Sequence, residues 1–104
     1  QDVLFGEGGN DTIDGAIGAD EIYGGTGDDN LSGGVWTDRL YGGDGQDALY
    51  GGDHHDTLFG GADADALYGG DSFDTLFGGA FNKDGSRFAF GAAASHGLLS
   101  AVAP

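Results

Sequence analysis

The chain has 104 residues, of which 24 are glycine and one is proline, and this length provides at most one domain. It carries 18 acidic and three basic residues, a formal charge of −15, which argues against nucleic acid and anionic membranes as partners. Cysteine is absent, and no apolar run approaches the ~20 residues that a membrane span needs. Because the sequence starts Gln1-Asp2-Val3 without a signal-like segment, we expect it to be part of a longer protein.

A period of nine residues runs from Gln1 to Phe77. Counted from Gly6, eight complete nonads follow one another: GEGGNDTID, GAIGADEIY, GGTGDDNLS, GGVWTDRLY, GGDGQDALY, GGDHHDTLF, GGADADALY and GGDSFDTLF. Position 1 is always Gly, position 6 is always Asp, and position 8 is always Ile or Leu. Three invariant columns in register exclude composition bias and predict a structure of stacked repeats.

Each nonad is expected to form one turn and one short strand. Gly at positions 1, 2 and often 4 permits tight bends, and positions 7 to 9 form a minimal strand. Alternation directs position 8 inward and positions 7 and 9 outward. Two nonads then make one coil of 18 residues with a strand in each of two sheets, and four coils stack at about 4.8 Å into a rod roughly 20 Å long.

The invariant aspartates point to a cation between the coils. They are Asp11, Asp20, Asp29, Asp38, Asp47, Asp56, Asp65 and Asp74. Stacking places like charges in file at about 4.8 Å, where they repel, and a core of one aliphatic side chain per nonad needs a further cross-link. Calcium fits better than magnesium because it accepts carboxylate and carbonyl oxygens in a forgiving geometry.

The pattern resembles the RTX nonapeptide repeat, G-G-x-G-x-D-x-U-x, of calcium-binding parallel β-rolls. The resemblance implies an all-β fold, a right-handed parallel β-roll, with the repeats in residues 1–77. It also implies that calcium lies between nonads n and n+2. The earlier turn gives the carbonyls of positions 2 and 4 and its Asp, and the later turn gives the carbonyls of positions 1 and 3 and its Asp.

The best-matched site under this resemblance joins Gly25, Gly27 and Asp29 to Gly42, Asp44 and Asp47. The other carbonyl ligands that it implies are Gly9, Gly18, Gly24, Thr26, Gly33, Gly34, Val35, Trp36, Gly43, Gly45, Gly51, Gly52, Asp53, His54, Gly60, Ala62, Gly69 and Asp71. Eight nonads allow about six Ca²⁺ ions, which would neutralise most of the −15 charge.

The resemblance further implies a secreted or cell-surface protein of a Gram-negative bacterium, exported by type I secretion. At the expected affinity of ~10⁻⁴–10⁻³ M, the chain stays disordered in the cytosol and becomes β-rich in millimolar calcium. The expected partners are attached domains of a longer parent chain.

Position 9 of alternate nonads predicts an aromatic ladder on one sheet: Phe5, Tyr23, Tyr41, Phe59 and Phe77. The other sheet reads Asp14, Ser32, Tyr50 and Tyr68, and is polar at its N-terminal end. Either the stacked rings reinforce the sheet, or they form a surface for a neighbouring domain, a second copy or sugar rings.

The turn 51–56, GGDHHD, has the residue types of a transition-metal site. The repeat register instead makes Asp56 the calcium ligand and assigns Asp53 and His54 only backbone carbonyls. Adjacent extended residues splay their side chains, so we expect exposed histidines rather than a Zn²⁺ or Cu²⁺ site. Bulky residues at position 4, such as Trp36 and Asp63, leave open whether neighbouring calcium sites are weakened.

Residues 78–104 are interpreted as a degenerate last repeat, a capping strand and an apolar tail. Lys83 stands where an Asp belongs, and we expect Asp84 to substitute for it if the register shifts by one residue. Arg87 to Phe90 is expected to form a short strand that caps the rod. The tail after Gly91 either packs on the rod or begins a larger piece.

No catalytic constellation is expected in this chain. It contains no nucleophile elbow, HExxH motif or P-loop, and His96 is expected to be a surface residue. Three functions remain open: a calcium-driven folding and secretion module, a structural array of an adhesin or surface layer, and a carbohydrate-binding module. An ice-binding ladder is not expected, because Thr fills position 7 only at Thr12, Thr57 and Thr75.

Overall fold

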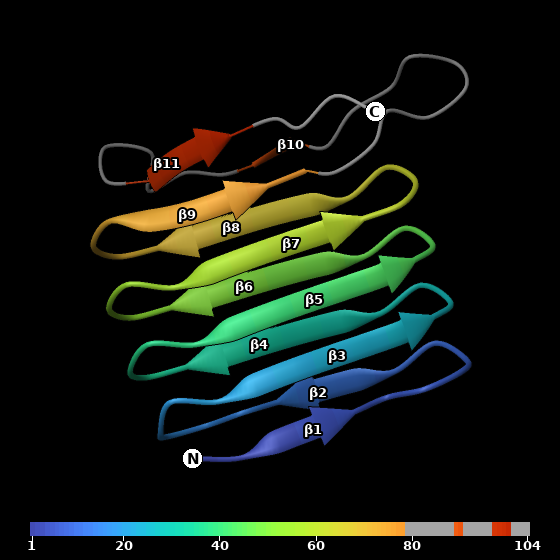
Figure 1. The fold of residues 1–104 in the computed structure, drawn as a ribbon, viewed down its shortest axis with the longest axis horizontal. Coiled ribbons are helices and arrows are strands. Elements are labelled where there is room, and N and C mark those ends of the chain that lie inside the picture. Colours follow the sequence, from blue (N-terminus) through green and yellow to red (C-terminus); the bar gives the residue numbers. More distant parts are fainter. Residues whose placement is uncertain (79–88, 91–96, 101–104) are drawn as a thin grey trace.

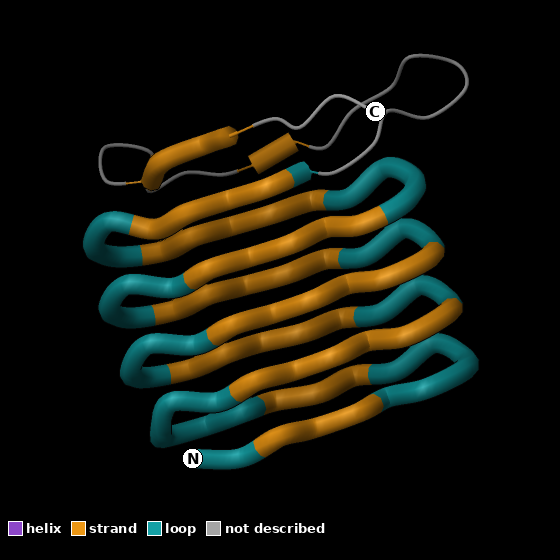
Figure 2. Tube along the Cα trace, in the orientation of Figure 1, coloured by secondary structure: helices purple, strands orange, loops and turns teal. Residues whose placement is uncertain are grey.

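The computed structural model describes residues 1–78, 89–90 and 97–100, and every element in this part is a β-strand. Figure 1 shows the strands stacked in successive coils, and Figure 2 shows the turns that join them along both edges. The strands are β1 (Val3–Phe5), β2 (Thr12–Asp14), β3 (Glu21–Thr26), β4 (Asn30–Gly34), β5 (Arg39–Asp44), β6 (Ala48–Gly52), β7 (Thr57–Gly61), β8 (Ala66–Gly70), β9 (Asp74–Phe77), β10 (Ala89–Phe90) and β11 (Gly97–Ser100). Among the described residues there is no helix long and apolar enough to cross a membrane.

The strands form two parallel sheets, as the period of nine predicts. One sheet has the order β1-β3-β5-β7-β9-β11, and the other has the order β10-β8-β6-β4-β2. Strands that pair within the repeats are 18 residues apart, so Ile22 lies beside Leu40 and Leu31 beside Leu49. The expected parallel β-roll, with one strand of each coil in each sheet, is confirmed.

The core is the single aliphatic column at position 8, as expected. Its fully buried members, 0–1% exposed, are Ile22, Leu31, Leu40, Leu49, Leu58, Leu67 and Leu76. Leu4 and Ile13 are partly buried and pack against this column. Because both sheets contribute to one column, the two layers are held together by a thin line of aliphatic contacts.

Strands β1 and β2 cover positions 7 to 9 as expected, whereas β3 to β8 are longer, so the expected strand length was wrong for those six. β3 and β5 each span six residues and continue through positions 1, 2 and 3 of the next nonad. Position 2 has a positive φ in all eight nonads, and the position 2 carbonyls of Glu7, Ala16, Gly34, Gly43 and Gly52 each accept an N–H from the following coil. One such bond joins Asp53 N to the Gly34 carbonyl oxygen at 2.9 Å. The hydrogen-bonded ladder therefore extends into the turn.

The aromatic ladder forms as expected along the six-stranded sheet. Neighbouring rings from Phe5 to Phe77 are stacked with centroids 4.6–4.9 Å apart and planes within 10° of parallel. On the other sheet, Tyr50 and Tyr68 stack at 4.8 Å. Stacked rings thus follow the strand spacing on both faces.

Two short strands extend the sheets beyond the repeats. β10 pairs with β8, and its residues fall inside the strand expected at 87–90. β11 pairs with β9 and was not expected as a strand. The expectations for Lys83, Asp84, Arg87 and His96 lie outside the described residues.

Candidate metal sites between the coils

The position 6 aspartates form two buried files, one along each edge of the roll. From Asp20 to Asp74 each is at most 4% exposed. The backbone N–H of each Asp in the two files from Asp2 to Asp56 donates to Oδ1 of the Asp 18 residues later. Asp29 N, for example, lies 2.8 Å from Asp47 Oδ1, and the seven such bonds measure 2.7–2.9 Å. One oxygen of each carboxylate therefore links two successive coils.

The second oxygen, Oδ2, is buried without a hydrogen-bond partner. This holds for Asp11, Asp20, Asp29, Asp38, Asp47, Asp56 and Asp65. A buried carboxylate oxygen without a donor is costly, and native structures rarely contain one unless an ion or water binds it. A repeated file of such oxygens indicates a repeated cation site.

The invariant glycine at position 1 is explained by this oxygen. A Cβ built on Gly42 would lie 2.6 Å from Asp47 Oδ2 and 2.6 Å from the Gly60 carbonyl oxygen. At Gly24 the corresponding contacts are 2.6 Å to Asp29 Oδ2 and 2.7 Å to the Gly42 carbonyl oxygen. The carboxylate of one nonad and the position 1 carbonyl two nonads later converge where a side chain would otherwise stand.

Positions 2 and 4 are explained by backbone conformation. Both have positive φ in every complete nonad, between 70° and 126°, the region that glycine adopts most readily. The Gly25 carbonyl oxygen faces Gly43 and the Gly27 carbonyl oxygen faces Gly45 in the next coil. Carbonyls of positions 2 and 4 thus point forward and those of position 1 point backward, the directions that the resemblance implied. That these residues bind calcium stays a prediction.

Burial raises the pKa of several column aspartates. The pKa of Asp47 rises to about 6, and those of Asp56 and Asp65 rise to about 8. The main cause is desolvation by burial, and neighbouring carboxylates raise the pKa further, whereas the N–H bonded to Oδ1 lowers it. The pKa of Asp38 is raised for the same main reason. Without a cation, these four aspartates are therefore harder to ionise than an exposed carboxylate.

The donor set fits calcium. Among the described residues, no three or more His, Cys, Asp or Glu side chains gather into a metal-binding group. A cation between coils would therefore rely on two carboxylates and several backbone carbonyls. Hard, all-oxygen sets with many carbonyls suit Ca²⁺ better than Mg²⁺ or a transition metal.

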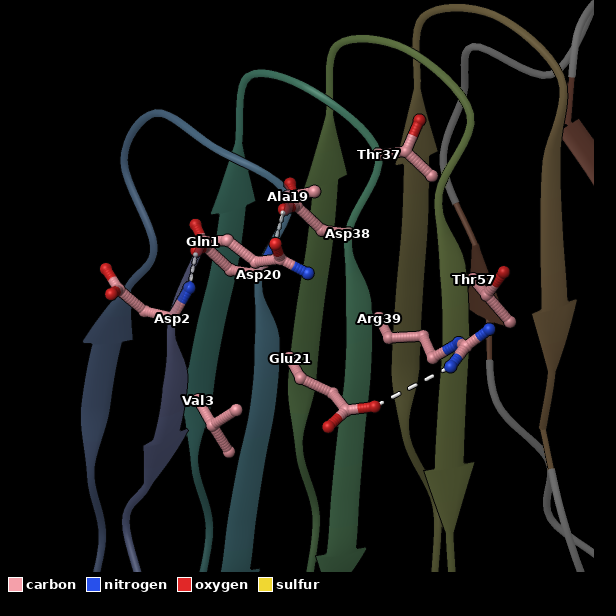
Figure 3. Close-up of a pocket in the computed structure, with 10 residues that line it drawn as sticks. All are labelled: Gln1, Asp2, Val3, Ala19, Asp20, Glu21, Thr37, Asp38, Arg39 and Thr57. Atoms are coloured by element: carbon pink, nitrogen blue, oxygen red, sulfur yellow. Dashed lines mark hydrogen bonds and ion pairs between the residues drawn. The ribbon is translucent and has the colours of Figure 1, made fainter.

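Figure 3 shows one edge of the roll, where the side chains of Asp2, Asp20 and Asp38 follow one another beside a groove of about 320 Å³. The dashed lines include the bond from Asp2 N to Asp20 Oδ1, at 2.7 Å. Glu21 and Arg39, also on the groove, form an ion pair at 3.6 Å.

The histidines lie in a turn and are exposed, as expected. Their imidazoles point to different coils: His54 Nδ1 accepts Trp36 N–H at 3.3 Å, whereas His55 Nδ1 lies 3.1 Å from Phe73 N. The Trp36 and His54 rings also stack, with centroids 5.4 Å apart. These two side chains do not converge on one ion, and they join coils instead.

Sequence reasoning missed the side-chain bonds that join turns to each other. Asp28 N–H donates to Asn10 Oδ1 at 2.8 Å, and Gln46 N–H donates to Asp28 Oδ1 at 2.9 Å. Gly45 N–H donates to Asp63 Oδ2 at 3.0 Å. The sequence pattern that could have predicted these bonds is the presence of polar acceptors at positions 4 and 5 of turns that lie 18 residues apart.

A comparison with protein families agrees with this geometry. The family model described as the RTX calcium-binding nonapeptide repeat (4 copies) matches residues 1–31, 32–67 and 59–82. No curated protein matches the chain. The matched residues cover most of the chain and include all eight aspartates of the column. The chain belongs to the RTX calcium-binding nonapeptide repeat family.

Proposed function

We propose that this chain is a structural module that folds when calcium binds between its coils, and that it stabilises or displays a larger secreted or surface protein. The observation that carries the proposal is the file of buried Oδ2 atoms without partners, each beside a backbone carbonyl of the next coil. A divalent cation there satisfies both oxygens and offsets the repulsion within the carboxylate file.

About six ions are expected. Eight complete nonads give six pairs of turns that are 18 residues apart, three along each edge. Because each ion offsets two negative charges, six ions would neutralise most of the −15 charge. Without calcium, the acidic side chains repel one another and the core is a single aliphatic column. The folded state therefore has low stability.

The dependence on calcium supports an extracellular role. Sites of this kind bind in the ~10⁻⁴–10⁻³ M range, so the module remains unfolded in the cytosol and folds after export. RTX repeats are typical of secreted bacterial proteins. In this proposal the chain itself is not an enzyme, and its aspartates serve the calcium sites. Its partners are attached domains of the parent protein.

The alternative, a sugar-binding face, is less well supported. Sugars stack on the faces of aromatic rings, but each face of Tyr23, Tyr41 and Phe59 is covered by a neighbouring ring. Only ring edges point outward along most of the ladder. This arrangement favours a structural role for the stacked rings.

The test is a calcium titration followed by circular dichroism and isothermal calorimetry, with magnesium as the control. Chelated protein should give a largely disordered spectrum, and millimolar calcium should convert it to a β spectrum with about six ions bound. A β spectrum of equal strength in chelator, with no heat of calcium binding, contradicts the proposal.

A further inference from the structure

The two edges of the roll carry different turns. The glycine edge, at the right of Figure 1, is formed by turns 6–11, 24–29, 42–47 and 60–65. The tryptophan edge, at the left, is formed by turns 15–20, 33–38, 51–56 and 69–74. Position 4 is Gly9, Gly27, Gly45 and Asp63 on the first edge, but Gly18, Trp36, His54 and Ser72 on the second.

Carboxylates are distributed unevenly between the six gaps. Turns 24–29 and 42–47 of the glycine edge supply four: Asp28, Asp29, Asp44 and Asp47. The other two gaps of that edge also have four acidic side chains each. Turns 15–20 and 33–38 of the tryptophan edge supply only their column residues, Asp20 and Asp38. The number of charged ligands and neighbours is a main determinant of calcium affinity.

The groove beside this poorest gap has one further unpaired carboxylate in its lining, that of Asp2. Glu21 and Arg39 line it, but they pair with each other and so cancel (Figure 3). Arg39 is also the only Lys or Arg among the described residues. The column itself is intact here: Asp20 Oδ2 is buried without a partner, and both it and the Gly33 carbonyl oxygen approach Gly15. The site is therefore formed, and its two turns hold the fewest carboxylates of the six gaps.

Backbone N–H groups also bind two carbonyl oxygens of this gap; the bond to the position 2 carbonyl recurs in other gaps, whereas the bond to Val35 is a feature of this one. Val35 N–H donates to the Ala16 carbonyl oxygen at 2.9 Å, and Gly18 N–H donates to the Val35 carbonyl oxygen at 3.2 Å. A parallel β-bridge pairs Ile17 with Val35, and Ile17 is 74% exposed. At position 3 this gap carries two aliphatic side chains, whereas four of the other five gaps carry at least one Asp.

We propose that the calcium site between turns 15–20 and 33–38 is the weakest of the six, so that the glycine edge fills first and this site fills in a separate later step. The proposal rests on the calcium-binding function proposed above. Two carboxylates fewer near a divalent ion correspond to roughly a tenfold or larger loss of affinity, even at the dielectric constant of water.

The test is a calcium titration of the whole chain, observed in two-dimensional amide NMR spectra at low salt. The amides of Gly27 and Gly43 report the glycine edge, and those of Gly18 and Gly34 report the poorest gap. Fluorescence of Trp36, the single tryptophan, gives a second signal from the tryptophan edge. The midpoint for Gly18 and Gly34 should lie about tenfold above that for Gly27 and Gly43.

A matched pair of variants isolates the cause. Ile17→Asp adds a carboxylate to the poorest gap at an exposed position and should lower the midpoint there several-fold. Asn30→Asp adds the same charge at the exposed glycine-edge end of β4, on the far side of the strand from this gap, and should leave the midpoint of Gly18 and Gly34 nearly unchanged.

One common midpoint for all four amides overturns the inference and leaves the calcium-binding function standing. An equal effect of Ile17→Asp and Asn30→Asp on the midpoint of Gly18 and Gly34 also overturns it. No response of any amide to calcium instead refutes the proposed function itself.

Discussion

Gly42→Ala should destabilise the β-roll, although alanine is only one methyl group larger than glycine. The φ of Gly42 is not in the left-handed region, so backbone strain does not arise. The new Cβ would lie 2.6 Å from both Asp47 Oδ2 and the Gly60 carbonyl oxygen, which is 0.8 Å inside the 3.4 Å where ordinary contact begins. Neither neighbour can withdraw freely, because Asp47 Cβ is itself only 3.1 Å away and the other atom belongs to the backbone.

The expected cost is about 2–3 kcal/mol, the upper part of the range for overpacking in a closely packed interior. The displaced oxygens are also the ones expected to face calcium, so the calcium midpoint should rise as well. Urea unfolding followed by circular dichroism, in saturating calcium, measures the first effect, and a calcium titration measures the second.

Gly8→Ala is the matched control. Its nearest neighbour would be Thr26 Oγ1 at 3.5 Å, an ordinary contact, and its φ is also outside the left-handed region. This variant should unfold within about 0.5 kcal/mol of the parent chain. If Gly42→Ala and Gly8→Ala have the same stability and calcium midpoint, the assignment of the position 1 oxygens to a shared site is wrong.

Three further predictions follow from the core, the carboxylates and the ladder. Leu49→Ala should cost about 2–5 kcal/mol in urea unfolding with calcium, and a loss below about 1 kcal/mol would contradict the single-column core. The pKa values of Asp56 and Asp65 are raised from 3.8 to about 8, so the folded calcium-free state binds protons that the unfolded chain releases. Its stability should therefore fall as pH rises from about 4 to 8, and calcium affinity should rise over the same interval, as titrations at several pH values can show; an affinity independent of pH would refute this coupling. Replacing Tyr41 and Phe59 with Ser should lower the thermal midpoint of the calcium-loaded form without changing the number of ions bound, and an unchanged midpoint would indicate that the rings serve a partner instead.

The period of nine was sufficient to predict the coil, the sheet pairing and the core. Position 8 holds only Leu or Ile, so a column such as Leu40 beneath Leu58 follows from alternation alone. The stack of Tyr23 on Tyr41 follows from the same register. Because the spacing repeats strictly, the same pairing of residues 18 apart applies to every coil. The predicted register is therefore the same throughout the repeats.

The features that the sequence did not predict depend on where individual carbonyls, carboxylate oxygens and side chains point. The strands extend past position 9 because positive φ at position 2 turns a carbonyl toward the next coil, as at Gly34, and a letter pattern does not contain that angle. The repeat predicts that each aspartate is a ligand but does not show which oxygen is free for the cation; Oδ1 of Asp47, for example, accepts the N–H of Asp29. The Trp36–His54 stack arises from side chains at a position that the repeat leaves variable.

The most direct test of the central claim is an X-ray structure of crystals grown in calcium, with the ions located by their anomalous scattering. Two files of ions should appear, one along each edge, each about 2.3–2.6 Å from a position 6 Oδ2 and from backbone carbonyls of two successive coils. In the best-matched gap, the ion should contact Asp29 Oδ2 and the Gly42 carbonyl oxygen. A well-ordered roll in which these oxygens hold no ion, or in which calcium binds only exposed side chains such as Asp44 and Asp53, would contradict the account.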